Sequence, residues 1–314
     1  MKVVFQYDAG PGLRRRLEAL AAEGFVVVPC EETDRTRFRA LLADADVLWH
    51  ILMPITAEVI AAAPKLRLIQ KVGVGVNTID LAAASARGIA VCNMPGTNSR
   101  AVAEMTLLLM LAALRKICWF DRKTREGRGW PLPPEIQDAL GEIAGRTVGL
   151  VGYGAVPRLL APVLRAMGAK VLYTARTAKP DAVAEWRTLA DLLAESDVVS
   201  LHAALSEKTE GLIGAQALAR MKPGAVLVNT ARGALVDEPA LAAALRSGRL
   251  GAAGLDVFAA EPAGPGHPLF ALPNVVLAPH VAWLTMETLE RSLAVAVENC
   301  RRLRAGTPLL HRVV

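Results

Sequence analysis

The sequence has little cysteine, and the cysteines it has do not cluster. Cys30, Cys92, Cys118 and Cys300 are spread over 314 residues with no C-x-x-C pair. Neither a zinc site nor a disulfide framework is therefore predicted, and no metal is expected.

Long hydrophobic runs are also missing. The longest, Met105 to Leu114, has about half of the roughly 20 residues that span a bilayer, and Glu104 and Arg115 flank it. It predicts a buried helix. Nothing near Met1 resembles a signal peptide, because the first apolar stretch leads into charged sequence without a small-residue cleavage site. We expect a cytoplasmic protein with no membrane partner.

The composition, 53% hydrophobic and 21% charged, is typical of a globular protein, and the length favours two domains. The formal net charge of +6 suits either nucleic acid or an anionic small molecule. The basic clusters near Arg14 and Arg301 lie at helical spacing beside leucines, which is typical of a solvated helix face. No nucleic-acid partner is expected.

Two series of alternating strand and helix patterns fill the chain. The first ends near residue 98 and the second runs to about 284, with a long helix from Ser99 to about Trp119 and an extended loop between them. Such alternation predicts parallel sheets covered on both faces. A last helix, Thr285 to about Arg304, has no sheet of its own, so we expect it to return to the first unit.

The stretch "VGLVGYGAVPRLL" predicts a dinucleotide-binding turn, because a strand leads into the glycines and a helix follows. Pro157 replaces the third glycine, which ordinarily serves helix packing, and proline suits a first helical turn. Pro162 lies deeper and should kink the helix. The motif alone fits a plain strand-to-helix turn equally well. The candidate cofactor contacts are Gly152, Gly154, Ala155 and Val156.

The end of the next strand bears on the choice of dinucleotide. An acidic residue normally binds the ribose of NAD about 20 residues past the glycines, but this sequence has Ala175 and Arg176 there. Arg176, with Thr177 or Lys179, would suit the 2′-phosphate of NADP. NADP is therefore the expected cofactor and NAD stays possible, while an exposed Arg176 without a ligand is the simpler alternative.

Three later strands each end near a reactive side chain. Arg232 follows one apolar strand, Glu261 the next and His280 the last. Each has an ordinary reading alone: an arginine at a loop, a surface glutamate, a histidine in a turn. A cation, a carboxylate and an imidazole at neighbouring strand ends beside a nucleotide turn outline an acid-base site.

The ordered segments "KVGVGVNTID", "NMPGTNSRAVAE", "NTARGALVDE", "DVFAAEP" and "LAPH" resemble the D-isomer-specific 2-hydroxyacid dehydrogenases. The resemblance covers nearly the whole chain. It implies an α/β fold in which a Rossmann-like dinucleotide-binding domain, residues 99–284, is inserted into a discontinuous flavodoxin-like substrate domain, residues 1–98 and 285–314. It also implies an active site in the cleft between the domains and a homodimer.

The resemblance assigns catalysis to Arg232, Glu261 and His280. The arginine would hold the carboxylate of a 2-keto acid and polarise its carbonyl. The histidine would be the general acid, or the base in reverse, and the glutamate would orient it.

Further positions follow by similarity or by placement. The backbone of Val74 and Gly75 would bind the substrate carboxylate. Met53 is a candidate lining residue, and Trp283 would either wall the pocket or pack in the domain interface. The expected cofactor contacts are Asp256, Thr230 and Ala231 near the nicotinamide, with His202 and Ala203 on the adenosine side.

These features predict a reductase of small 2-keto acids such as glyoxylate or hydroxypyruvate, giving the D-2-hydroxy acid. The same fold acting on a bulkier keto acid, or on phosphite, is an alternative. Formate oxidation is disfavoured, because formate dehydrogenases of this fold carry glutamine at the position of Glu261. A corepressor-like protein that senses the dinucleotide is a further alternative.

Overall fold

A computed structural model describes residues 1–314, which divide into two compact units. Unit 1 combines Met1–Asn98 with Thr285–Val314, and unit 2 is the intervening Ser99–Leu284. Each unit has its own parallel sheet, so the predicted α/β fold class is confirmed.

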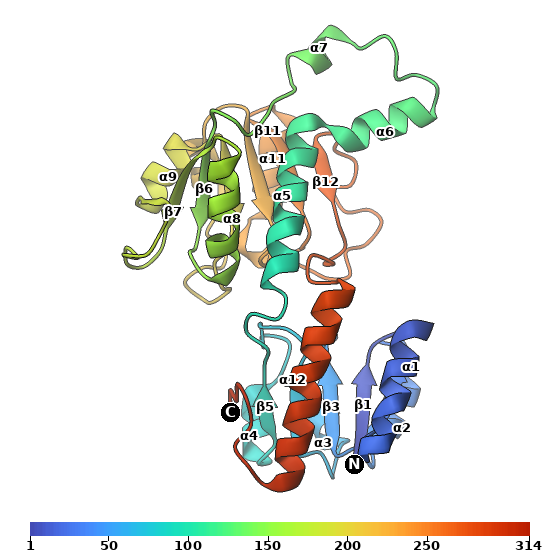
Figure 1. The fold of residues 1–314 in the computed structure, drawn as a ribbon. Helices are drawn as coiled ribbons and strands as arrows, with labels where there is room; N and C mark the ends of the chain where they lie inside the picture. The colour runs from blue at the N-terminus through green and yellow to red at the C-terminus, as the bar shows by residue number, and fades with distance from the viewer. The chain divides into compact units, whose positions relative to one another are not determined.

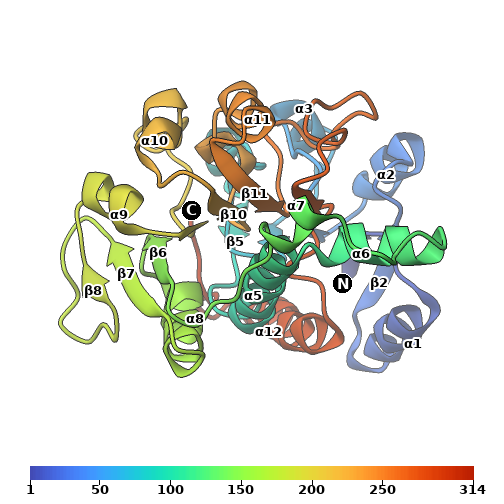
Figure 2. The ribbon, with the colours of Figure 1, turned by 90° about the horizontal axis from the view of Figure 1, so that it is seen from above.

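Unit 1 is a five-stranded sheet in the order β2-β1-β3-β4-β5, which is the flavodoxin-like order. Figure 2 shows α1 and α12 on one face of this sheet, with α2 and α3 on the other. The elements are β1 (Lys2–Gln6), α1 (Pro11–Ala19), β2 (Val26–Cys30), α2 (Arg35–Leu42), β3 (Val47–His50), α3 (Ala57–Ala61), β4 (Leu68–Lys71), α4 (Leu81–Ala86), β5 (Ala90–Cys92) and α12 (Met286–Ala305), with a short 3₁₀ turn at Leu20–Glu23.

The last helix returns to the first sheet through both apolar and polar contacts. Ala296 and Cys300 of α12 are fully buried. The side-chain amide of Asn299 donates to the Gln70 side chain at 2.6 Å and to the carbonyl of Leu310 at 3.1 Å. Because the amide is buried, these bonds are needed to offset its desolvation. The chain's last helix thus completes unit 1.

Unit 2 is a seven-stranded parallel sheet in the order β12-β11-β10-β9-β6-β7-β8. Figures 1 and 2 show α5 and α8 on one face and α9, α10 and α11 on the other. The elements are α5 (Ser99–Arg115), α6 (Ile117–Arg125), α7 (Pro134–Gln137), β6 (Thr147–Val151), α8 (Ala155–Ala166), β7 (Lys170–Thr174), β8 (Glu185–Trp186), α9 (Leu189–Glu195), β9 (Val198–Leu201), α10 (Ala215–Arg220), β10 (Ala225–Asn229), α11 (Glu238–Arg246), β11 (Leu250–Leu255) and β12 (Val275–Leu277), with a 3₁₀ turn at Gly233–Leu235.

Chain order reverses in this sheet between β6 and β9, which pair side by side. Open parallel sheets bind ligands at the carboxyl ends of their strands near such a reversal. An apolar layer packs against each face of the sheet. The glycine turn follows β6 and His202 follows β9, so both lie at the carboxyl ends of the two strands between which the chain order reverses.

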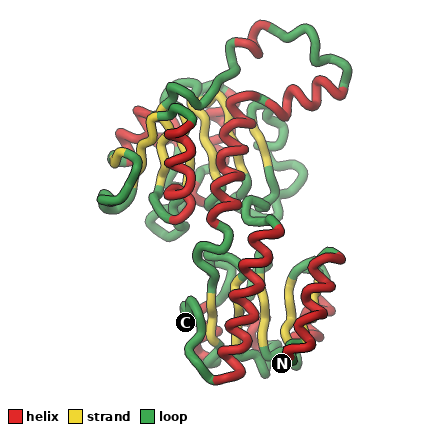
Figure 3. The backbone as a smooth tube through the Cα atoms, viewed as in Figure 1, coloured by secondary structure: helices red, strands yellow, loops and turns green.

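Two details of the predicted helices are wrong. The expected single helix from Ser99 to Trp119 ends at Arg115, because Lys116 has a left-handed backbone (φ 50°), and α6 begins after it. The expected extended loop is partly helical, since it contains α7 (Figure 3).

The proline-containing helix α8 runs without a break from Ala155 to Ala166. Pro157 lies in its first turn, as predicted. Pro162 is inside it, with its side chain exposed. Among all the helices, none combines the length and apolar character required of a membrane span.

Candidate active site

Three adjacent strands of unit 2 place the predicted acid-base residues at one edge of the sheet. β10, β11 and β12 are neighbours. Arg232, Asp256 and His280 each follow the carboxyl end of one of them within a few residues. Parallel pairing aligns these strand ends, so residues far apart in sequence meet.

The imidazole of His280 is paired with Glu261. Its Nδ1 lies 2.6 Å from Oε2 of the glutamate, and the other carboxylate oxygen, Oε1, accepts a hydrogen bond from the backbone N–H of Phe258 at 2.9 Å. Burial by itself would raise the pKa of Glu261. The bond from His280, the Phe258 N–H and the charge of Arg232 outweigh it and lower the pKa. Glu261 is thus held as a carboxylate.

The backbone around His280 is held in an unfavourable conformation. His280 has φ 56°, a left-handed value that is uncommon for residues other than glycine. Its N–H donates to the carbonyl of Asp256 at 2.6 Å, and the indole N–H of Trp283 donates to its carbonyl at 3.1 Å. These bonds on both sides of the residue stabilise the conformation that aims the imidazole at Glu261.

Asp256 also holds the segment after His280. Its two carboxylate oxygens accept hydrogen bonds from the N–H groups of Val281 and Ala282, at 2.8 and 3.0 Å. Burial nevertheless raises the pKa of Asp256. The structure therefore shows Asp256 supporting the histidine loop, a contact that the sequence pattern did not indicate.

Arg232 is positioned by Asn229, the last residue of β10, and by Ala231. Asn229 donates to the carbonyl of Arg232 at 2.8 Å and accepts from the N–H of Ala231 at 3.0 Å. The guanidinium donates to the Ala231 carbonyl at 2.6 Å. Burial lowers the pKa of Arg232, and the charge of Glu261 opposes that shift. Asn229 was not predicted, although a polar residue at the end of the apolar strand "AVLVN" was a signal.

The two glycines of the predicted nucleotide turn have different roles. Gly152 has φ 101°, and a Cβ atom there would lie 2.8 Å from the carbonyl carbon and oxygen of His202. Gly154 has open space where its Cβ would be, and no side chain caps the start of α8 that follows it. An open backbone beside an uncapped helix start fits a pyrophosphate. The turn therefore fits a dinucleotide despite Pro157.

The strand end across the reversal carries His202 and Ala203. The Nε2 atom of His202 lies 3.0 Å from the Ser200 hydroxyl. Burial lowers the pKa of His202 to about 3, so the ring is neutral at physiological pH.

Thr230, directly after β10, forms a hydrogen bond with the hydroxyl of Thr106 at 2.8 Å. Because Thr106 gives its own proton to the Val102 carbonyl, Thr230 is the donor in this bond.

Arg176 and Thr177 are exposed after β7, with Lys179 nearby at 3.5 Å from the Thr177 hydroxyl. The first carboxylate after them in the sequence, that of Asp181, forms an ion pair with Arg158. The Arg158 guanidinium also stacks over Tyr153, 5.4 Å from the ring centroid. The sequence alone did not predict that Asp181 is neutralised by Arg158.

In unit 1, the predicted substrate residues lie on two loops at strand ends. The carbonyl of Val74 accepts from the Asn93 side chain at 2.9 Å, and Val74 is 47% exposed. Gly75 and Met53 are partly buried. His50 is fully buried, between Gln6 and Thr78, so its role is structural.

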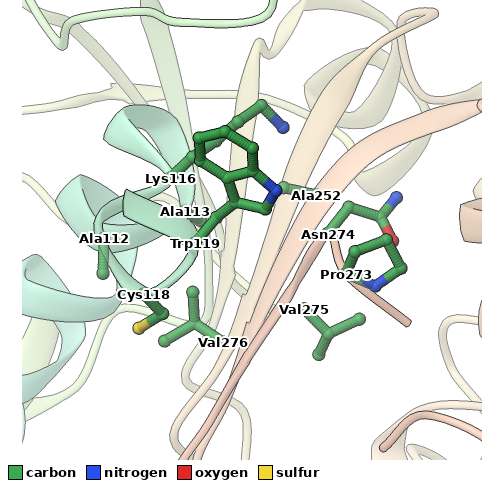
Figure 4. A pocket seen from close by; sticks show the side chains of 10 residues that line it. All are labelled: Ala112, Ala113, Lys116, Cys118, Trp119, Ala252, Pro273, Asn274, Val275 and Val276. Atoms are coloured by element: carbon green, nitrogen blue, oxygen red, sulfur yellow. The ribbon is translucent and has the colours of Figure 1, made fainter. Parts of the chain in front are cut away.

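A separate cavity of about 20 Å³ lies at the break between α5 and α6 (Figure 4). Lys116, Cys118, Trp119 and Asn274 are among its lining residues. This volume has room for about one water molecule. Since Asn274 precedes β12, the cavity is at the amino ends of the strands, away from His280.

Comparisons with known proteins identify the family of the chain. Residues 107–282 match the family model "D-isomer specific 2-hydroxyacid dehydrogenase, NAD binding domain". The chain is 42% identical over 265 residues to the glyoxylate reductase of Aeropyrum pernix, covering 82% of this chain and 79% of the relative. It is 42% identical over 278 residues to the D-3-phosphoglycerate dehydrogenase of Mycobacterium leprae, covering 87% of this chain and 52% of that one.

A solved structure extends the likeness to both units. The NADPH-dependent glyoxylate/hydroxypyruvate reductase of Sinorhizobium meliloti, in complex with NADP and malonate, has a TM-score of 0.84 and 30% identity. The match covers 100% of this chain and 96% of that one. The chain belongs to the D-isomer specific 2-hydroxyacid dehydrogenase family. It is an oxidoreductase that uses a nicotinamide dinucleotide to reduce a 2-keto acid to the 2-hydroxy acid.

Proposed function

We propose that the protein is an NADP-preferring reductase of small 2-keto acids of the glyoxylate and hydroxypyruvate type, giving the D-2-hydroxy acid. The observation that carries this is the His280–Glu261 pair, with Nδ1 2.6 Å from Oε2, beside the charge of Arg232. The glyoxylate and glyoxylate/hydroxypyruvate reductases among its relatives support the substrate class.

The reducing cofactor supplies the hydride when it is bound. His280 has its Nδ1 occupied by Glu261, so Nε2 is the nitrogen that gives a proton to the carbonyl oxygen and takes it back in the reverse direction. Glu261 stabilises the imidazolium form. Arg232 binds the substrate carboxylate and polarises the carbonyl with its planar donors.

The loop after β4 is proposed to bind the substrate carboxylate. The carbonyl of Gly73 accepts from the N–H of Met94 and that of Val74 accepts from the Asn93 side chain, and these bonds hold the turn in place. The N–H groups of Val74 and Gly75 on this turn are proposed to bind the anion. Gly73 has φ 144°, which favours glycine at the turn. Met53 and Trp283 are proposed to limit the size of the substrate side chain.

The preference for NADP is proposed from charge. Arg176 and Thr177 are exposed at the end of β7, where no carboxylate follows directly, and Asp181 is neutralised by Arg158. A 2′-phosphate would meet cations there without repulsion. The relative solved with NADP supports the same choice. NAD stays the alternative. Gly152, Gly154, Ala155, Val156, His202, Ala203, Thr230, Ala231 and Asp256 complete the proposed cofactor contacts.

We further propose a homodimer in the cytoplasm. Large apolar side chains are exposed on α5, α6 and the loop that follows, among them Leu108, Ile117 and Trp130, which is 78% exposed. Such a surface is typical of an interface. All four cysteines are free thiols, the form that a reducing compartment maintains.

The proposal is tested by steady-state oxidation of NADPH and of NADH with glyoxylate, hydroxypyruvate, pyruvate, phenylpyruvate and 3-phosphohydroxypyruvate. We expect the highest kcat/KM with NADPH and one of the first two acids, and a loss of at least about 100-fold in His280→Ala. A preference for the phosphorylated or aromatic acid would overturn the substrate class. Tight NADPH binding without turnover of any acid would favour a sensor.

A further inference from the structure

Unit 2 contains a second glutamate-histidine pair besides Glu261 and His280. Glu238 is the first residue of α11, and its Oε2 lies 3.1 Å from Nε2 of His267. Both side chains are largely buried, with 16% and 15% exposure. The Nδ1 atom of His267 accepts from the N–H of Leu269 at 3.4 Å. A neutral ring with its proton on Nε2 satisfies both contacts.

The other oxygen of Glu238 reaches the segment that carries Glu261. Oε1 accepts a hydrogen bond from the N–H of Ala259 at 2.8 Å. The preceding N–H, that of Phe258, donates to Glu261 itself at 2.9 Å. Two consecutive backbone N–H groups therefore bind two different carboxylates, and Glu238 anchors the segment that Glu261 also binds.

The same peptide also contacts the Arg232 segment. A Cβ atom at Gly233 would overlap the Phe258 carbonyl group and the N atom of Ala259. The residue after Arg232 is thus packed directly on the Phe258–Ala259 peptide. His267 packs edge-on against the Phe258 ring, with centroids 5.4 Å apart. One peptide links the backbones of both proposed catalytic loops, and Glu238 with His267 fixes that peptide.

We propose that Glu238, held by His267, is a positioning residue that sets the distance between Glu261 and His280 and the placement of Arg232. This rests on the catalytic roles proposed above. The hydrogen bonds of Glu238 go to the N–H of Ala259 and to His267, so Glu238 acts on the proposed catalytic residues through the Phe258–Ala259 peptide. A displacement of about 1 Å in such a group costs roughly 100-fold in rate.

The experiment is a double-mutant cycle between Glu238 and Glu261. Glu238→Ala is expected to lower kcat about 10- to 100-fold, with the Kd for NADPH within about twofold of the wild type. In the Glu261→Gln background the same change should cost less than it does in the wild type, because the carboxylate that the peptide positions against the imidazole is gone and only the effect on Arg232 remains. Glu238→Gln keeps one acceptor for Ala259 and should lose less activity than Glu238→Ala.

The matched control is Asp191→Ala, which removes an acid from the first turn of α9 and leaves the Phe258 segment untouched. It should keep kcat within about twofold. If Glu238→Ala does not fold, Glu238→Gln is used in the cycle instead. Wild-type kcat in both Glu238 variants, or an equal loss in both backgrounds, would overturn the positioning role. Full activity in His280→Ala would instead overturn the catalytic assignment on which it rests.

Discussion

His280 and Glu261, 19 residues apart in sequence, lie with Nδ1 and Oε2 2.6 Å apart in unit 2. The histidine has a left-handed backbone, and the glutamate is tied to the N–H of Phe258. Both ends of the pair are thus held by the protein's own backbone. Such preorganisation is what general acid-base catalysis requires of an imidazole.

The charge of Glu261 should matter more than its shape. Because its pKa is lowered, it is ionised throughout the neutral range, and Glu261→Gln removes that charge while keeping the side-chain volume. We expect kcat to fall about 10- to 100-fold, less than in His280→Ala. Stopped-flow and steady-state rates at pH 7 measure this, with NADPH binding by fluorescence as the control for folding. Wild-type kcat in the glutamine variant would contradict an electrostatic role.

The two turn glycines should respond differently to alanine. Gly152→Ala combines a positive φ with a close approach to His202, so we expect a loss of about 2 kcal/mol or more in the free energy of unfolding. Gly154→Ala meets open space and should change stability by less than about 0.5 kcal/mol. Its methyl group would instead occupy the phosphate position and weaken NADPH binding at least about tenfold. Denaturation curves and NADPH titrations separate the two, and equal effects on stability would refute the distinction.

Arg176→Ala tests the choice of dinucleotide. The change removes a cation from the exposed end of β7, so KM for NADPH should rise about tenfold while KM for NADH stays within about twofold. Arg165→Ala, at another exposed arginine of the same unit, is the control and should change neither constant. Parallel increases for both dinucleotides would show that Arg176 does not read the 2′-phosphate.

His202 should make the protein acid-sensitive. Its folded pKa of about 3 is below the unfolded value of about 6.5, so its contribution is fully present above about pH 6.5 and is lost as the pH falls toward 3. At pH 5 the loss reaches about 2 kcal/mol. Urea unfolding at pH 7.5 and pH 5 should show a smaller difference for His202→Gln than for the wild type. His50, present in both proteins, cancels in this comparison, and identical pH slopes would rule out the contribution of His202.

The ordered motifs were enough to predict much of the molecule. Alternating patterns predicted two parallel sheets, because strands buried on both faces must be apolar throughout. The return of α12 followed from a helix with no sheet beside it. The position of Arg232 and His280 after apolar strands predicted that they would gather at one sheet edge. The long helix was predicted to continue past its actual end at Arg115, since nothing in its apolar pattern marks the left-handed backbone at Lys116.

The sequence by itself determined the alternation of strands and helices, the family and the candidate chemical groups of this protein, since periodicity and motif order are local properties of the chain. The tertiary structure alone decided how those groups are held. Each holding bond joins a carboxylate to a backbone N–H of another segment or across a tight turn. Asp256 accepts from Val281 and Ala282, Glu261 accepts from Phe258, and Glu238 accepts from Ala259. Backbone N–H groups are the same at every residue except proline, so only the folded path of the chain determines which one a carboxylate meets.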